Sequence, residues 1–414
     1  MKSRTFLKAL GPGLLWAGAA IGVSHLVQST RAGAGFGFEL VWLLLLANIF
    51  KYPFFEFGPR YAAATGESLI HGYKRMGNFA VILYAVITIS TMFILMSAVT
   101  AVTAGLFENI FAFGWSNFQW SVLILLVAAG IIAFRKYSTI DRLIKFIIII
   151  LAVTALVALF AALSKGFHPD PQYSNHFSWT TDIAFVLALV GWMPSAIDIS
   201  VWHSVWTTAK TKESGYKPKL KESLLDFNIG YIGTVILSLV FLTLGALVMY
   251  GTPQEFSPKG AAFAGELIHL FTENLGAGAY YIIAPAALAA MVSTTLTCLD
   301  AYPRVLEPTT TLLFKRIDKE KYSSKLHFFW LFIVTGGTIT IFAYLMSSMA
   351  DMVDFATTVS FLVAPVLGFL NLKAVTGKNV PDAAKPKPWL LVLSWLGLFF
   401  LTALSIYFIY VRFL

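Results

Sequence analysis

The sequence has 414 residues and contains one cysteine, Cys298. A lone cysteine excludes an intramolecular disulfide framework and any cysteine-based zinc or iron–sulfur centre. Charged residues are also scarce, because Asp, Glu, Lys and Arg make up only 12% of the chain, about half the share in a typical soluble domain. Hydrophobic residues make up 58% and aromatic residues 15%. This composition excludes a water-soluble globular protein and a disordered chain, and it indicates a membrane protein.

Apolar stretches of roughly 20 residues, separated by turn residues, predict eleven membrane spans. The first stretch follows Met1-Lys2-Ser3-Arg4 and continues to about Val27, which is too long for a cleaved signal sequence, so we expect it to be retained. The predicted spans cover residues 10–30, 40–64, 79–107, 118–134, 143–164, 180–206, 226–250, 278–305, 327–349, 353–373 and 388–411.

The lysines and arginines predict the orientation. With the N-terminus in the cytoplasm, all but five of the 30 basic residues fall in cytoplasmic segments; the exceptions are Arg31, Lys51, Lys165, Lys259 and Arg412. This positive-inside bias predicts a bacterial-type inner (plasma) membrane protein with a cytoplasmic N-terminus and an external C-terminus. It also explains the net charge of +9 without a nucleic-acid partner. The expected partners are the lipid bilayer and a small inorganic ion, and a monomer is expected.

Two spans carry helix-breaking residues at mid-membrane depth. The first contains the small and polar run Gly18–His25, and the sixth contains Gly191 and Pro194. Proline lacks an amide donor and clashes with the preceding turn, and glycine is easily unwound, so both helices are expected to be interrupted. Interruptions at matching positions of two halves indicate a transporter made of inverted repeats. Glycine and proline are also common in membrane helices, so a purely structural role remains an alternative.

Several stretches resemble one family, the Nramp metal-ion transporters. Gly11–Phe38 is similar to the family's first helix without a gap, Met193-Pro194 stands where the family has Met-Pro-His, and Ser293–Thr297 resembles its Ser-Ser-Thr-Ile-Thr. The resemblance covers the whole chain in span count and order. Further family-like residues of the second span are Asn48, Arg60, Thr65 and Gly66.

The resemblance implies an all-α membrane protein with the LeuT-like fold of the APC superfamily. This fold has 11 transmembrane helices, 5+5 inverted repeats and broken helices 1 and 6, and it works by alternating access. Residues 1–414 would form a single transmembrane domain, with repeats at about 10–164 and 180–373 and an extra helix at 388–411. We expect no enzymatic activity, because no base and nucleophile can be paired by spacing, and no cofactor apart from a bound sodium ion.

The departures from the family determine the predicted substrate. Where the family has Asp-Pro-Gly-Asn, whose Asp and Asn bind the metal, this chain has Gly22-Val23-Ser24-His25, and Ser195 replaces the histidine of Met-Pro-His. Hard divalent cations need oxygen ligands, usually with carboxylates, and a dication without a countercharge is costly inside a membrane. Residues 79–107 also lack the acidic side chains of the family's proton route. We therefore predict a substrate other than a hard divalent cation.

The preferred prediction is uptake of a small anion such as bicarbonate. Half-helix N-termini carry partial positive charge, and an intramembrane lysine adds to it. The predicted binding residues are Gly22, Ser24, His25, Gly191, Met193 and Ser195, and the predicted electrostatic or gating residues are Lys51, Glu56, Arg60 and Asp198. Alternatives remain open for three of these residues: a neutral His25 ring bonded to a freed carbonyl, a Met193 side chain that only packs, and a Lys51 that snorkels or pairs with Glu56 or another buried acid.

Hydroxyl groups of the eighth span predict sodium coupling. In the LeuT-like fold, sodium can bind between carbonyls of the unwound first helix and hydroxyls of helix 8, here Ser293, Thr294 and Thr297. The alternative is that these hydroxyls only bond back to their own helix. Two other functions remain: a divalent metal transporter (Mn, Fe or Mg type) that uses His25 and Met193 as ligands, and a receptor or scaffold that transports nothing.

Overall fold

The computed structural model describes residues 11–134, 137–254, 256–314, 319–344 and 348–413. Lys2, Arg4 and Lys8, which support the predicted orientation, lie outside the described residues. The described residues form helices joined by loops, with no strand among them. Eight of their helices are long and apolar enough to cross a membrane.

The first and sixth spans are both divided, as their helix-breaking residues predict. The first consists of α2 (Pro12–Ala20), a π-helical segment (Ser24–Ser29) and α3 (Thr30–Phe36). The sixth consists of α9 (Ile183–Trp192) and α10 (Ile199–Ser214). Because each piece is short, these spans cross the bundle only as composite elements.

The other nine predicted spans each correspond to one continuous helix over the described residues, and residues 345–347 of the span predicted at 327–349 lie outside them. They are α4 (Val41–Thr65), α6 (Asn78–Phe111), α7 (Asn117–Phe134), α8 (Tyr137–Lys165), α11 (Leu220–Val248), α13 (Tyr280–Leu313), α14 (Lys319–Tyr344), α15 (Met349–Val375) and α16 (Pro388–Phe413).

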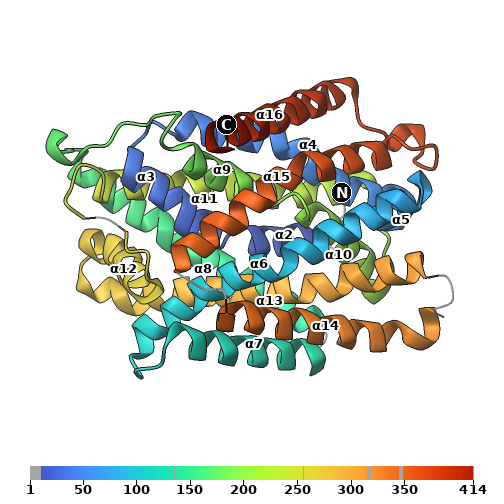
Figure 1. Ribbon diagram of the computed structural model, residues 1–414, viewed down its shortest axis with the longest axis horizontal. Helices are drawn as coiled ribbons and strands as arrows, with labels where there is room; N and C mark the ends of the chain where they lie inside the picture. Colours follow the sequence, from blue (N-terminus) through green and yellow to red (C-terminus); the bar gives the residue numbers. More distant parts are fainter. Residues whose placement is uncertain (1–10, 135–136, 255, 315–318, 345–347, 414) are drawn as a thin grey trace.

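Two further helices were not predicted, because both are too short to span a membrane. They are α5 (Leu69–Met76) and α12 (Gly260–Leu275). They lie at opposite ends of the helix bundle, with α12 at the left of Figure 1 and α5 at the right. They therefore belong to the connections on the two faces of the protein.

Glycines bring the broken first span into close contact with α11. A β-carbon on Gly33 would lie 1.9 Å from the carbonyl oxygen of Leu242, and one on Gly245 would lie 2.2 Å from that of Thr30. Small residues allow membrane helices to approach this closely. At the start of α2, the Asp226 carboxylate of α11 accepts hydrogen bonds from the amides of Gly13 (2.6 Å) and Gly11 (3.2 Å). These contacts hold α2 and α3, the two ends of the first span, against one helix.

Candidate substrate pocket

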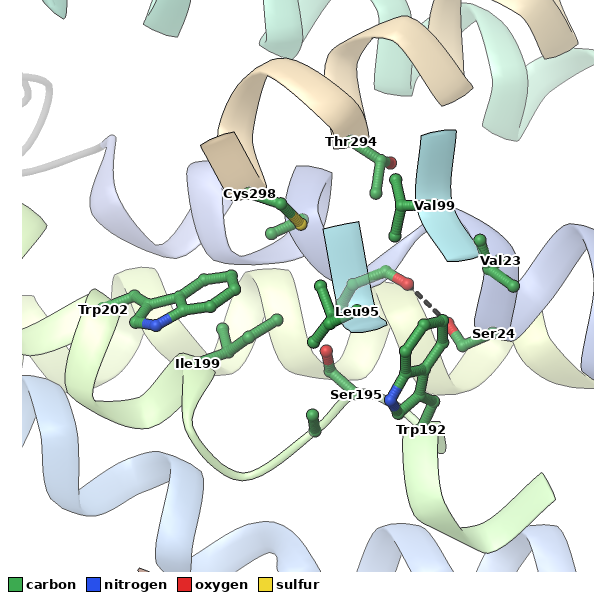
Figure 2. Close-up of a pocket in the computed structure, with 13 residues that line it drawn as sticks. Val23, Ser24, Leu95, Val99, Trp192, Ser195, Ile199, Trp202, Thr294 and Cys298 are labelled. Atoms are coloured by element: carbon green, nitrogen blue, oxygen red, sulfur yellow. Dashed lines mark hydrogen bonds between the residues drawn. The ribbon is translucent and has the colours of Figure 1, made fainter. Parts of the chain in front are cut away.

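A small cavity lies between the two broken helices, in the middle of the bundle (Figure 2). Its volume of about 20 Å³ is enough for one water-sized species. The lining side chains come from both breaks and from α6, α10 and α13. They are Ala19, Ala20, Val23, Ser24, Leu95, Val99, Trp192, Ser195, Ala196, Ile199, Trp202, Thr294 and Cys298.

Besides the indoles of Trp192 and Trp202, the polar side-chain groups of this pocket are three hydroxyls and one thiol. They belong to Ser24, Ser195, Thr294 and Cys298, and no carboxylate or basic side chain lines the pocket. The Ser24 hydroxyl lies 2.5 Å from the carbonyl oxygen of Ala20 (Figure 2). The pocket therefore offers neutral oxygen and sulfur atoms to a ligand.

His25 points away from the pocket, although it is adjacent to Ser24 in the sequence. Its Nε2 donates to the carbonyl oxygen of Thr234 in α11 (2.9 Å), and its Nδ1 lies 2.7 Å from the Ser24 hydroxyl and 3.0 Å from the Ala20 carbonyl. The ring is fully buried. This geometry agrees with the alternative in which the imidazole satisfies a main-chain carbonyl near the break.

Met193 is buried but does not line the pocket. Among the described residues, no group of three or more His, Cys, Asp and Glu side chains is placed to hold a metal ion. Binding of a metal by His25 and Met193 would therefore require both side chains to turn toward the pocket. Of the predicted binding residues, Ser24 and Ser195 are the ones that line it.

Thr294 joins the eighth span to the first break. Its hydroxyl oxygen lies 3.2 Å from the carbonyl oxygen of Gly18, 3.4 Å from that of Ile21 and 3.1 Å from that of Ala290. A β-carbon on Gly22 would lie 2.6 Å from this hydroxyl, so the approach requires glycine. Four oxygens from two helices therefore gather at the position expected for sodium.

The other two predicted sodium ligands have different surroundings. The Thr297 hydroxyl donates to the carbonyl oxygen of Ser293 (2.7 Å) and so bonds to its own helix. The Ser293 hydroxyl is buried and has no hydrogen-bond partner in the described part of the chain. Thr294 is therefore the hydroxyl that the structure places at the break.

The four predicted electrostatic residues separate into two groups. Glu56 pairs with Arg60 on α4, with its carboxylate 2.7 Å from the Arg60 Nε, and Arg60 also donates to the carbonyl oxygen of Ala384 (2.7 Å). This pair ties α4 to the loop before α16. Lys51 does not pair with Glu56, but donates to main-chain carbonyls at the second break. Asp198 is buried outside the pocket lining, and its Oδ1 has no hydrogen-bond partner among the described residues.

Residues 13–411 match the family described as Natural resistance-associated macrophage protein-like. The chain belongs to the Nramp family. An uncharacterized protein of Pasteurella multocida is 35% identical over 406 residues, which cover 97% of this chain and 92% of that protein. The divalent metal cation transporter MntH of Listeria innocua is 23% identical over 432 residues, covering 98% and 90% of the two chains.

A solved manganese transporter of Eremococcus coleocola has the same fold as this Nramp chain. The two structures superpose with a TM-score of 0.68 at 15% identity, covering 98% of this chain and 87% of the other. The expected LeuT-like architecture is thus confirmed, and the chain is an integral membrane transporter of the Nramp family. Its departures from the family motif, Gly22 and Ser195 among them, belong to an otherwise conventional Nramp framework.

Two larger cavities lie on either side of the pocket of this Nramp protein. The outer vestibule, at the predicted external face, has a volume of about 340 Å³ and is lined by Arg31, Phe185 and Thr252 among others. The inner vestibule, about 450 Å³, is lined by Ser68, Thr208 and other residues of the opposite face. The small central pocket thus lies between two wider spaces.

An ion pair at the outer vestibule connects the first span to α15. The Arg31 guanidinium donates to both carboxylate oxygens of Asp354, at 2.7 Å and 3.2 Å, and the Gln28 amide donates to the same carboxylate at 3.1 Å. Neither residue of this pair stood out as functional in the sequence, although Arg31 is one of the few basic residues predicted at the external face. Cys298 was missed in the same way; it lies one helical turn after Thr294 and so shares its face.

Proposed function

We propose that this Nramp protein is a secondary active transporter that carries a small inorganic ion by alternating access. The observation that carries this proposal is the position of the pocket, which lies between two broken helices and two vestibules. Broken helices at the bilayer midplane form the substrate sites of inverted-repeat transporters. The Arg31–Asp354 pair would close the outer route, and its rupture would open it.

A divalent metal cation is the first candidate substrate. Relatives that match almost the whole chain are named as divalent metal cation transporters, and the pocket has room for one dehydrated ion rather than a larger solute. The available ligands are the hydroxyls of Ser24, Ser195 and Thr294 and the thiol of Cys298. A sulfur ligand without carboxylates favours a borderline or soft metal over Mg²⁺.

A small anion is the second candidate, and one specific observation favours it. The pocket is lined by hydroxyl-bearing side chains without any carboxylate, so a bound dication would lack a countercharge, which is costly away from water. Bicarbonate would need a wider pocket than the present 20 Å³. An anion would therefore have to enter a more open conformation.

Sodium coupling is proposed on the geometry at Thr294. Its hydroxyl and the carbonyls of Gly18, Ile21 and Ala290 provide neutral oxygens from both sides of the contact between α2 and α13. A sodium ion held there would bridge the two helices, so its binding would be coupled to movement of the first span. The proposed mode is symport.

Flux into proteoliposomes distinguishes the candidates. Uptake of Mn²⁺ and of bicarbonate is measured with an inward gradient of either sodium or choline, for the wild type, Thr294→Val and the control Ser405→Ala. Ser405 is buried in α16 and its hydroxyl donates to Leu401, so this variant tests the loss of a hydroxyl away from the site.

Each outcome assigns a function. Uptake of one ion that is lost in Thr294→Val and kept in Ser405→Ala supports transport and identifies the substrate class. If uptake is equal with sodium and with choline, sodium coupling is contradicted, but the transport proposal itself is not. If neither these ions nor other inorganic ions enter under any gradient, the receptor or scaffold alternative is favoured and the transport proposal is refuted.

A further inference from the structure

The ammonium group of Lys51 occupies an unusual position for a membrane lysine, because it is enclosed by main-chain carbonyls. Its side chain is fully buried in α4. The Nζ atom donates to the carbonyl oxygens of Val190 (3.0 Å), Gly191 (2.9 Å) and Ser195 (2.6 Å). The first two end α9, and the third lies in the interruption that follows.

The number of these hydrogen bonds bears on the charge of the group. Carbonyl oxygens only accept, so three such bonds need three N–H donors, which the charged ammonium has and a neutral amine lacks. The Phe55 ring lies on another side of the group, with its centroid 5.7 Å from Nζ, which is within the range of a cation–π contact. Both the carbonyls and the ring thus fit the charged form of Lys51.

The three carbonyls are themselves suited to any small cation. Two of them, those of Val190 and Gly191, end α9, where carbonyls lack a helical amide partner and carry the negative end of the helix dipole. The Val190 carbonyl also accepts from the Met193 amide (3.3 Å). Close packing fixes the position of Gly191, because a β-carbon there would lie 2.3 Å from the carbonyl oxygen of Thr357 in α15. The charged side chain that interacts electrostatically with Lys51 is Asp198, at the start of α10.

We propose that the second break contains a monovalent cation site, formed by the carbonyls of Val190, Gly191 and Ser195, whose permanent occupant is the Lys51 ammonium. In this proposal the cation at the break after α9 is a side chain of α4, whereas the break after α2 remains available to a free sodium ion. This cation is also next to the pocket, because Ser195 both accepts a hydrogen bond from the ammonium through its carbonyl and lines the pocket.

Chemical rescue tests this site. In Lys51→Ala the carbonyls are kept and the space of the side chain is vacated, so free NH₄⁺ is able to take the place of the ammonium. Lys51→Met keeps an unbranched side chain that fills the space without charge, and so it blocks the site. Lys74→Ala is the matched control, because Lys74 also donates to a carbonyl, that of Leu312 (2.8 Å), but at the end of the bundle where α5 lies.

The melting temperature of each purified variant is measured against increasing NH₄Cl, with choline chloride at equal concentration as the reference. We expect Lys51→Ala to melt well below the wild type in choline chloride and to recover by several degrees, saturably, in NH₄Cl. K⁺ should have a similar effect, because carbonyl oxygens coordinate it as well. The wild type, Lys51→Met and Lys74→Ala should show no specific response.

Two results would overturn the proposal. One is a Lys51→Ala variant that melts like the wild type in choline chloride, and the other is an equal effect of NH₄Cl on all four proteins. If Lys51→Ala is not recovered folded in choline chloride, its yield from membranes solubilised in NH₄Cl is compared instead, and no increase there also overturns it. Since stability is the readout, failure of this site leaves the proposed transport untouched.

Discussion

Opening of the outer vestibule can be measured through the single cysteine of this protein. Cys298 lines the central pocket, is buried and is free. A thiol reagent added at the predicted external face reaches it only when the outer route opens. Because Cys298 is the single cysteine of the chain, the wild-type protein needs no cysteine removed, and Cys298→Ser provides the background.

The perturbation is removal of the Arg31–Asp354 ion pair. In Arg31→Gln and Asp354→Asn, the bidentate contact of 2.7 Å and 3.2 Å that joins the first span to α15 is lost. The two side chains are 22% and 39% exposed, so solvent screening limits their interaction. A bidentate pair of this kind belongs at the upper end of the surface range, about 1 kcal/mol.

If the pair forms only in the closed state, its loss shifts the equilibrium toward the open state by the same free energy. A shift of about 1 kcal/mol corresponds to roughly a fivefold change in population. We therefore expect Cys298 to react about five times faster with a membrane-impermeant thiol reagent in either single variant. The double variant should react no faster than the singles, because both remove the same interaction.

The assay uses cells or oriented vesicles, and labelling is quantified by mass shift over time. Lys385→Gln is the control, because it removes a surface ion pair of 2.7 Å with Asp382 in the loop before α16. Unchanged labelling rates in both single variants would show that the pair does not close the outer route. Additive effects in the double variant would show that the two residues act separately.

Three further predictions concern the contacts around the first span and α4. Gly22→Ala places a β-carbon 2.6 Å from the Thr294 hydroxyl. We expect it to lower the free energy of unfolding by about 1–3 kcal/mol, measured by thermal melting, and to abolish flux. Gly35→Ala is the control, because a β-carbon there would have no atom within 4 Å, and it should leave both stability and flux unchanged. Asp226→Asn weakens the carboxylate contact to the amide of Gly13 (2.6 Å) and should cost about 1 kcal/mol, and an unaltered melting temperature would contradict that role. Arg60→Ala leaves the Glu56 carboxylate buried without its cation, which typically costs about 3–5 kcal/mol, and this is checked by the yield of folded protein.

The divided helices follow directly from residue types. Pro194 and the glycines at positions 22 and 191 predicted both interruptions, because these residues disfavour a continuous helix wherever they occur in a span. The short helices α5 and α12 were not predicted, since neither is long enough to register as a span. Of the three hydroxyls predicted to bind sodium, that of Thr294 meets the first break, whereas that of Thr297 bonds to its own helix.

The surroundings of charged and polar side chains could not be deduced in the same way. Ser24 and His25 are adjacent in the sequence and were predicted to bind the substrate together. In the structure, Ser24 lines the pocket, whereas His25 hydrogen-bonds to α11. For Lys51 the sequence allowed an anion site, snorkelling or a buried acidic partner. In the structure its ammonium donates to three carbonyls and also interacts electrostatically with the buried Asp198. Each of these outcomes depends on a partner that is far away in the sequence.

The amino-acid sequence by itself determined the membrane location, the order of the spans and the positions of the two interruptions. These properties depend on local composition, because each segment in lipid must satisfy its own backbone hydrogen bonds. The tertiary structure alone decided which side chains line the pocket, which pair across helices and which carbonyls hold Lys51. Such contacts depend on the rotation and approach of packed helices, and a single sequence does not encode these as a local pattern.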